Sequence, residues 1–273
     1  MSLERVLTII VTRNNGEEIP ACLEGLDRAG TGLDLETVVI DNASKDRTKA
    51  ILSSWQGQGA GREVVFNRKN IGLARAVNMG AAKFDWCEKI VVLNPDVVPH
   101  EKSIFRLSRA MDRLEHAGLL LPKLVDKHGR LQPSCRTFYD ARTILARRAP
   151  VLNRFFASSG IVRRHLMLDR DHDREMEVDW GQGAAFMVRR SALERRDQVF
   201  DPGYFLYFED VDLAWSMWNR GYKVMYVPSS VMTHGYRRSS AGLSNISAFL
   251  HLRSAVRFFL KTRCREPGRE NNA

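Results

Sequence analysis

Short apolar runs alternate with amphipathic stretches through the first third of the chain, and this alternation restricts the fold more than any other feature. The runs are rich in β-branched residues, as expected of buried strands, and lie at residues 6–12, 36–41, 64–66 and 90–93. Between the first two runs, apolar residues from Ile19 to Leu26 recur at helical spacing. Alternating strands and helices are typical of a parallel sheet covered on both faces. The sequence therefore predicts an α/β fold with a mostly parallel central sheet flanked by helices.

The pattern changes after Asp96. Three further helices are expected: one over residues 100–117, one that follows the 205–213 segment and ends at Arg220, and one near the C-terminus. Further strands are expected over 178–188 and 223–228. Residues 134–177 have no sustained period but many arginines, which favours a mobile basic lid, with plain disorder as the alternative. No internal repeat, low-complexity tract or linker is evident, so one domain is expected over residues 1–273.

Charge and cysteine content narrow the class of protein. The formal net charge of +10 indicates an anionic partner, which can be a nucleotide, a nucleic acid or a lipid surface. The cysteines are scattered without a CxxC pair, which argues against a zinc site and a disulfide framework and fits a reducing cytosol. No run of 18 or more apolar residues occurs, so we do not expect a protein integral to a membrane.

Asp96 follows the strand expected at residues 90–93. Pro95 lacks the N–H donor that a central strand needs, so pairing stops there and Asp96 lies just past the carboxyl end of the strand. Ligands bind at this edge in open α/β sheets. A carboxylate at that edge is suited to hold a divalent cation, and the alternative is an ordinary turn aspartate.

Asp41 and Arg75 are further candidates for ligand binding. Asp41 ends the second expected strand and so shares a sheet edge with Asp96. Its carboxylate can accept the N3–H of a uracil or thymine ring; alternatively, it caps its own loop. Arg75 lies on the first turn of the helix after Gly72, where anions are favoured, unless it is simply a solvated helix arginine.

Glu209, Asp210 and His234 are candidates for chemistry. The two acids begin a helix after an aromatic run, so they can stabilise the helix terminus, or act as a general base if the apolar surroundings raise a carboxylate pKa. His234 follows a short apolar segment and can bind a metal through its imidazole, although a structural histidine is the alternative.

Taken in order, these segments resemble the family 2 glycosyltransferases with the GT-A fold, from Val6 to His234. TRNN at residues 12–15 resembles the TYNN loop of that family, and VIDNASKD at 39–46 resembles its VDNxSxD nucleotide loop. NIGLARAVNMG at 70–80 is similar to NxGxAxAxNxG, and LNPD at 93–96 stands where the family has its DxD metal motif. GAAFMVRR at 183–190 resembles GAxMLVRR, and YFEDVDLAW at 207–215 resembles YxEDxDLxxR.

The resemblance implies an inverting, metal-dependent transferase that uses a nucleotide-diphosphate sugar. It implies that Asp210 is the base, that Glu209 positions the acceptor, and that Mg²⁺ or Mn²⁺ is the cofactor. The implied metal ligands are Asp96 and His234. The implied donor-binding residues are Thr12, Asn14, Asp41, Arg75, Asn94, Asp96 and Gly183.

Two departures from the family pattern affect the donor site. Arg13 replaces a tyrosine, so its packing on the base of the nucleotide is open, and Asn94 replaces the first acid of DxD. The Asn-Pro-Asp form resembles the branch that contains bacterial rhamnosyltransferases, which use dTDP-L-rhamnose. We therefore expect rhamnosyl transfer to a glycan or lipid-linked acceptor in polysaccharide or cell-wall synthesis, with a UDP-hexose donor as the alternative.

The resemblance also divides the chain into a nucleotide-binding half (1–98), an acceptor-binding half (99–240) with the basic insert at 134–177, and a basic amphipathic helix and tail (241–273). The tail helix carries an apolar stripe of Phe249, Leu252, Val256, Phe259 and Leu260. Packing of this stripe on the core is the favoured interpretation. The alternative is peripheral contact of a cytoplasmic protein with the inner face of an anionic membrane.

Two other classes of protein are less well supported. A nucleic-acid-binding protein would carry basic residues interleaved with aromatic ones on one surface, whereas here the basic excess lies in the middle and the tail, away from the acidic strand ends. A dinucleotide-dependent oxidoreductase would carry G-x-G-x-x-G after its first strand, and this chain does not. No nucleic-acid partner is therefore expected.

Overall fold

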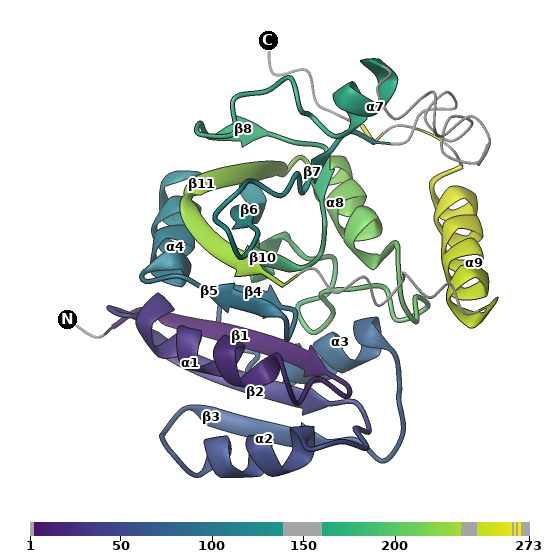
Figure 1. Ribbon diagram of the computed structural model, residues 1–273. Helices are drawn as coiled ribbons and strands as arrows, with labels where there is room; N and C mark the ends of the chain where they lie inside the picture. The colour runs from purple at the N-terminus through teal and green to yellow at the C-terminus, as the bar shows by residue number, and fades with distance from the viewer. Residues whose placement is uncertain (1–2, 139–159, 236–244, 264, 266, 269–273) are drawn as a thin grey trace.

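The computed structural model describes residues 3–138, 160–235, 245–263, 265, 267 and 268 (Figure 1). The strands of its main sheet are β1 (Arg5–Thr12), β2 (Asp34–Asp41), β3 (Arg62–Phe66), β4 (Lys89–Leu93), β5 (Val97–Pro99), β6 (Ala117–Val125), β8 (Met176–Glu177), β10 (Ala185–Arg189) and β11 (Lys223–His234). Their order is β3-β2-β1-β4-β10-β6-β11-β5, with β8 paired to β11. The strands β7 (Cys135–Arg136) and β9 (Trp180–Gly181) form a separate ribbon.

The helices around the sheet are α1 (Ile19–Ala29), α2 (Thr48–Gln56), α3 (Leu73–Lys83), α4 (Ser103–Arg113), α7 (Gly160–His165), α8 (Glu209–Asn219), α9 (Asn245–Thr262) and the 3-10 helix η1 (Arg190–Ala192). In the first half, β1 to β4 pair in parallel. Alternate side chains of β1 point to opposite faces, so Leu7 and Ile9 share a core with α3, whereas Val6 and Ile10 share one with α1. The predicted α/β fold, with a central sheet flanked by helices, is confirmed.

The second half makes the sheet mixed. β10 enters antiparallel between β4 and β6, while β6 and β11 are parallel and β5 is antiparallel to β11. Ala185 is opposite Leu93, and His234 is opposite Val97. The loop before β10 and the end of β11 are therefore held at the edge where the parallel strands end.

Three predicted elements need correction. The single strand predicted over 178–188 is wrong: β9 and β10 belong to different sheets, and the loop between them holds Gly183. The helix predicted over 100–117 is limited to α4, because β6 begins at Ala117. β11 continues past Val227 to His234 through a register shift, so the strand predicted at 223–228 is too short. Much of the predicted lid, residues 139–159, lies outside the described residues.

The tail helix packs on the opposite side from the one predicted. Figure 1 shows α9 lying beside α8 at the periphery of the molecule. The buried side of α9 contains Ala255 and Phe258, whereas Phe249, Leu252, Val256 and Leu260, which form most of the predicted stripe, are exposed. The prediction that the stripe packs on the core is therefore wrong for these residues. Of the helices that the structure describes, none has the length and apolar character to span a bilayer.

Candidate active site

A cleft of about 620 Å³ lies at the carboxyl ends of β1 and β4. It is lined by loops that follow these strands, by the loop before β10 and by the start of α8. The site residues predicted from the sequence that line it are Thr12, Asn14, Asn94, Asp96, Gly183, Glu209, Asp210 and His234. The cleft thus combines residues that are more than 200 positions apart in the chain.

Asp96 and His234 form one titratable pair in the cleft. The Oδ2 atom of Asp96 lies 3.5 Å from the Nε2 atom of His234, and the backbone of Gly235 donates to the Asp96 carbonyl at 2.8 Å. The pairing of β5 with β11 produces this contact. Burial lowers the pKa of His234, which favours the neutral imidazole that binds metals. Burial also raises the pKa of Asp96, and the attraction of His234 opposes this effect.

The donor set fits a divalent cation that shares its ligands with a bound molecule. Asp96 supplies carboxylate oxygens, His234 supplies an imidazole nitrogen, and Asn94 and Glu18 line the same cleft. The negative charge of Glu18 also raises the pKa of Asp96. Among the described residues, no group of three His, Cys, Asp or Glu side chains can hold a metal alone. A cation at Asp96 would therefore need oxygens from its ligand.

Glu209 and Asp210 form the second titratable pair. Tyr207 and Phe208, just before α8, have positive φ angles of 70° and 66°, a conformation that is unusual without glycine. Gly183 donates its N–H to Asp210 Oδ2 at 2.9 Å, and Val211 donates to Oδ1 at 2.9 Å. Two backbone donors thus hold the Asp210 carboxylate in one orientation.

Burial and like charge act together on this pair. Burial, as the larger cause, and repulsion from the charge of Asp210, as the smaller, raise the pKa of Glu209 to about 8. Burial also raises the pKa of Asp210, while its backbone hydrogen bonds and the positive charge of Arg136 lower it. The Oε2 atom of Glu209 has no hydrogen-bond partner within the described part of the chain. At neutral pH the arrangement therefore favours a protonated Glu209 beside an Asp210 whose charge is partly stabilised.

The loops of the nucleotide-binding half are joined into one wall by side-chain hydrogen bonds. Asn14 accepts the N–H of Lys45 at 2.7 Å. Asn42 donates to Asn70 Oδ1 at 2.8 Å and accepts the N–H of Ile71 at 3.0 Å. These contacts fix the loops after β1 and β2 and the loop before α3 relative to one another.

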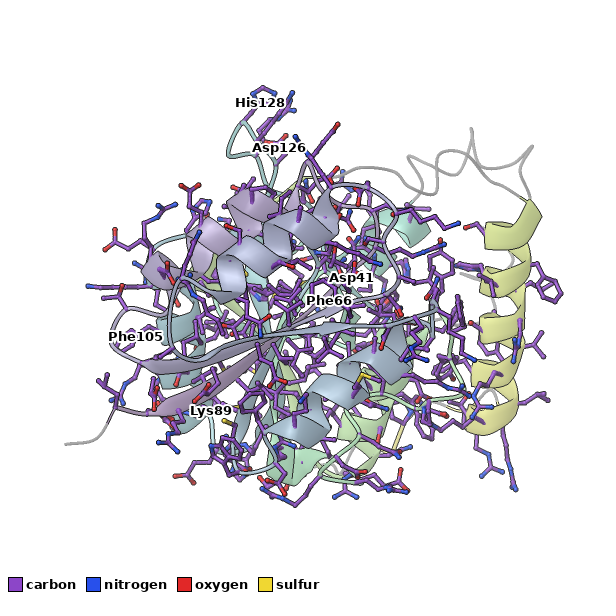
Figure 2. All side chains as sticks on the ribbon, turned by 90° about the horizontal axis from the view of Figure 1, so that it is seen from below. Asp41, Phe66, Lys89, Phe105, Asp126 and His128 are labelled. Carbon is purple, nitrogen blue, oxygen red and sulfur yellow. The ribbon has the colours of Figure 1, made fainter. Side chains whose placement is uncertain are left out.

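Asp41 and Arg75 do not line the cleft. Asp41 is fully buried and accepts the N–H of Ser44 at 3.2 Å, so it does stabilise its own loop; it lies beside Phe66 at the ends of β2 and β3 (Figure 2). Its other oxygen, Oδ1, has no partner among the described residues. Arg75 is exposed and donates to the Pro202 carbonyl at 3.2 Å. The roles expected for Asp41 and Arg75 in donor binding stay predictions.

Two cleft residues, Glu18 and Gln182, were not singled out from the sequence. Arg13, which replaces the tyrosine of the family pattern, lines the cleft beside Asn14. Glu18 lies only a few residues after the TRNN motif, so its acidic side chain near a strand end was a usable signal. Gln132, which contacts His234, gives no such signal, because 102 residues separate the two.

Comparison with known proteins gives the family. Residues 8–196 match the family model described as glycosyl transferase family 2, which covers more than half of the chain. The chain therefore belongs to glycosyl transferase family 2. As the sequence motifs implied, it is a glycosyltransferase.

Two curated relatives cover most of the chain. An N-acetylglucosaminyl-diphospho-decaprenol L-rhamnosyltransferase from Mycobacterium tuberculosis is 29% identical over 271 residues, with 93% of this chain and 83% of that protein covered. The rhamnosyltransferase WbbL from Escherichia coli K12 is 24% identical, with 94% of each chain covered. The predicted resemblance to the rhamnosyltransferase branch is thus confirmed.

Solved structures share the fold. The structure of GalNAc-T7 with UDP, GalNAc and Mn²⁺ has a TM-score of 0.68 and 19% identity; it covers 94% of this chain, which spans about half (48%) of that one. The mannosyltransferase PcManGT from Pyrobaculum calidifontis, in complex with GDP-Man and Mn²⁺, has a TM-score of 0.60 and 19% identity, with 97% of this chain and 66% of that chain covered. The GT-A fold is confirmed.

Proposed function

We propose that the protein transfers L-rhamnose from dTDP-L-rhamnose to a lipid-linked acceptor that carries N-acetylglucosamine on a diphosphate, in the synthesis of a cell-wall glycan. The observation that carries this proposal is one cleft that holds both a metal-type pair, Asp96 and His234, and a buried acid pair, Glu209 and Asp210. The choice of sugar is supported by the names of the two rhamnosyltransferases and by the Asn-Pro-Asp sequence at residues 94–96.

The proposed reaction is a direct displacement with inversion. Asp210 takes the proton of the acceptor hydroxyl, the hydroxyl oxygen bonds to the anomeric carbon of the donor sugar, and the nucleoside diphosphate leaves with the bonding electrons. The N–H of Gly183 keeps Asp210 oriented through this step. Glu209, with its pKa raised to about 8, keeps its proton at neutral pH and donates a hydrogen bond to the acceptor.

Asp96 and His234 are proposed to hold Mg²⁺ or Mn²⁺, with Asn94 beside them. The cation would neutralise charge on the leaving diphosphate. Both side chains line the cleft, and the Oδ2 atom of Asp96 lies 3.5 Å from the Nε2 atom of His234. The loops joined through Asn14 and Asn42 hold the donor side of the cleft in place. Asp41 and Arg75 are proposed to support donor binding from outside the cleft lining.

A lipid-linked acceptor also implies where in the cell the protein acts. We place the protein in the cytoplasm, in peripheral contact with the inner face of the membrane that holds the lipid-linked acceptor. The 1–98 half then binds the nucleotide, the 99–240 half binds the acceptor, and the helix and tail at 241–273 complete one catalytic domain.

Product release from defined donors tests the proposal. The full chain is incubated with Mg²⁺ or Mn²⁺, a short-chain lipid diphosphate that carries N-acetylglucosamine, and either dTDP-L-rhamnose or UDP-hexoses. We expect acceptor-dependent release of dTDP and a rhamnosylated product of inverted configuration. Release of UDP from a UDP-hexose, with no turnover of dTDP-L-rhamnose, would overturn the choice of donor.

A further inference from the structure

The outer face of α9, defined as Phe249, Leu252, Val256 and Leu260, is an exposed apolar surface. Their exposed fractions are 65%, 52%, 49% and 75%. Spacings of three and four residues put them on one side of the helix. Four large apolar side chains left in water on one stripe are unfavourable, and such a surface usually marks an interaction site.

The opposite side of α9 is fixed to the protein by polar contacts as well as by packing. Arg257 bonds to Asp201 at 2.9 Å, and Lys261 bonds to Asp212 at 2.7 Å. The Ser254 hydroxyl donates to the Leu206 carbonyl at 2.8 Å. Rotating the apolar stripe inward would break these bonds and leave Asp201 and Asp212 without their basic partners on α9. The outward direction of the stripe is therefore built into the interface.

The same helix contacts a wall of the active-site cleft. The hydroxyl groups of Tyr207 and Ser247 lie 2.9 Å apart, and the ring of Tyr207 lies 5.2 Å from that of His251. Leu206 and Tyr207 both line the cleft, and they come shortly before Glu209 and Asp210 in the chain. A surface bound by α9 would therefore lie close to the acceptor side of the cleft.

We infer that the outer face of α9 docks the enzyme onto an anionic lipid bilayer. Residues 245–262 contain no acidic residue, Arg253 flanks the stripe, and Arg263 follows the helix; both arginines are exposed. An apolar stripe beside basic side chains lies in the interface of a membrane and is attracted by anionic headgroups. The inference rests on the proposed function, because a lipid-linked acceptor is reached from that surface.

Vesicle co-sedimentation of the full chain tests this surface. The variant Leu252→Gln/Leu260→Gln changes only exposed side chains, and Trp86→Gln, which removes a side chain 51% exposed elsewhere, is the matched control. We expect binding to vesicles of phosphatidylglycerol and phosphatidylethanolamine, weaker binding at high salt, and binding of the double variant weakened at least about tenfold. The Trp86→Gln control should bind like wild type.

Other outcomes identify what else covers the surface. Undiminished vesicle binding by the double variant would overturn the inference. A second result would also overturn it: analytical ultracentrifugation shows a dimer for wild type but not for the double variant, and neither protein binds vesicles. Turnover of a water-soluble short-chain acceptor should be equal in wild type and double variant. That assay separates failure of this surface from failure of the proposed reaction.

A separate observation concerns Gln132, in the segment between β6 and β7. Its Nε2 donates to the His234 carbonyl at 2.9 Å, and its Oε1 lies 3.0 Å from His234 Nδ1. A carbonyl can only accept, so the NH₂ group faces it and Oε1 faces the ring. Nδ1 must then carry the proton, which leaves the lone pair of Nε2 directed to the Asp96 side.

The geometry points to Gln132 as a positioning residue that sets the tautomer of His234 for metal binding. Partners of this kind orient metal-binding histidines, and their loss typically costs about 10–100-fold in metal affinity. Glutamate at this position still accepts from Nδ1–H, whereas leucine does not. This inference rests on the metal site of the proposed function.

Two measurements test the tautomer of His234 and the binding of metal separately. Nitrogen NMR of wild type, without metal, should show the proton on Nδ1 of His234, and Gln132→Leu should lose this preference while Gln132→Glu keeps it. Titration of Mn²⁺ with dTDP present should show about 10–100-fold weaker binding for Gln132→Leu and near-normal binding for Gln132→Glu. A proton on Nε2 in wild type would overturn the inference, whereas a wild type that binds no Mn²⁺ would overturn the metal site itself.

Discussion

The two titratable pairs of the cleft are buried by the same fold but respond differently. Burial favours the neutral form of Asp96, His234, Glu209 and Asp210. In the pair Asp96–His234, attraction between opposite charges opposes the effect of burial on the pKa values. In the pair Glu209–Asp210, repulsion between like charges adds to the effect of burial on the pKa of Glu209. The first pair is thus suited to bind a cation, and the second to hold and accept protons.

The origin of each pair matches this difference. Asp96 and His234 come from segments that are joined by the pairing of β5 with β11, so their distance depends on the long-range strand register. Glu209 and Asp210 are neighbours at the start of α8, and the N–H of Gly183, from a distant part of the chain, holds Asp210 in place. Substitutions that address one pair at a time can therefore test the division of roles.

The largest effect is expected for Asp210→Asn. The amide cannot accept the proton of the acceptor, so turnover should fall by about 10²–10⁴-fold, as for loss of a general base. Affinity for dTDP in the presence of Mg²⁺ should stay within about twofold, because the proposed base does not contact the donor. Steady-state kinetics and calorimetric titration of dTDP measure the two quantities.

Glu209→Gln is the matched control for that variant, since it keeps the shape and the hydrogen-bond donor of a protonated Glu209. It should lower turnover far less than Asp210→Asn. If Glu209→Gln abolishes turnover while Asp210→Asn retains it, the two acids have exchanged roles. If neither matters, the base lies elsewhere.

A smaller effect is expected for Asp96→Asn, which changes the Asp96–His234 pair and should weaken metal binding. It removes the carboxylate that we assign to the metal while keeping the side-chain size. The affinity for Mn²⁺ in the presence of dTDP should fall at least about tenfold, since the loss of a residue that only orients a metal ligand already costs about 10–100-fold. Binding of Mn²⁺ without nucleotide should be weak in both proteins, because the described residues do not complete a metal site.

Metal titrations followed by electron paramagnetic resonance measure both conditions. Asn94→Asp offers a control of opposite sign, because it adds an acid to the same turn. It should tighten Mn²⁺ binding without nucleotide. Tight binding by the apo wild type that Asp96→Asn leaves unchanged would remove Asp96 from the metal site.

Local patterns predicted the nucleotide-binding half well, and the reasons are visible in particular residues. The β-branched runs predict β1, β2 and β4, and Pro95 predicts the end of pairing before Asp96. The same argument placed Asp41 at the sheet edge, but it could not show that the backbone turns Asp41 inward to bond Ser44. The direction of a side chain beyond a strand depends on the contacts of its loop, which a strand pattern does not contain.

Features that depend on distant partners were not predictable in this way. The amphipathic pattern of α9 predicts a helix with an apolar side, but Arg257 and Lys261 determine which side faces the body, through Asp201 and Asp212. The strand predicted over 178–188 failed for a related reason, since β9 pairs with β7 in a second sheet. In each case the deciding contact joins residues more than 40 positions apart.

The last prediction concerns stability rather than activity or binding, and Glu209→Gln tests it by its pH dependence. The pKa of Glu209 is raised in the folded protein to about 8 from the ordinary value of 4.5. Between these values the unfolded chain releases a proton that the folded protein keeps, so wild type loses stability as pH rises. The glutamine variant has no such proton. Its free energy of unfolding should exceed that of wild type by an amount that grows between about pH 4.5 and 8, by at most about 1.4 kcal/mol per pH unit. Urea unfolding of both proteins at pH 5, 6 and 7.5 checks this, and contributions from Asp96 and His234 largely cancel in the difference. A difference that stays constant with pH would mean that Glu209 is ionised in the folded protein, and it could then not serve as a proton donor to the acceptor.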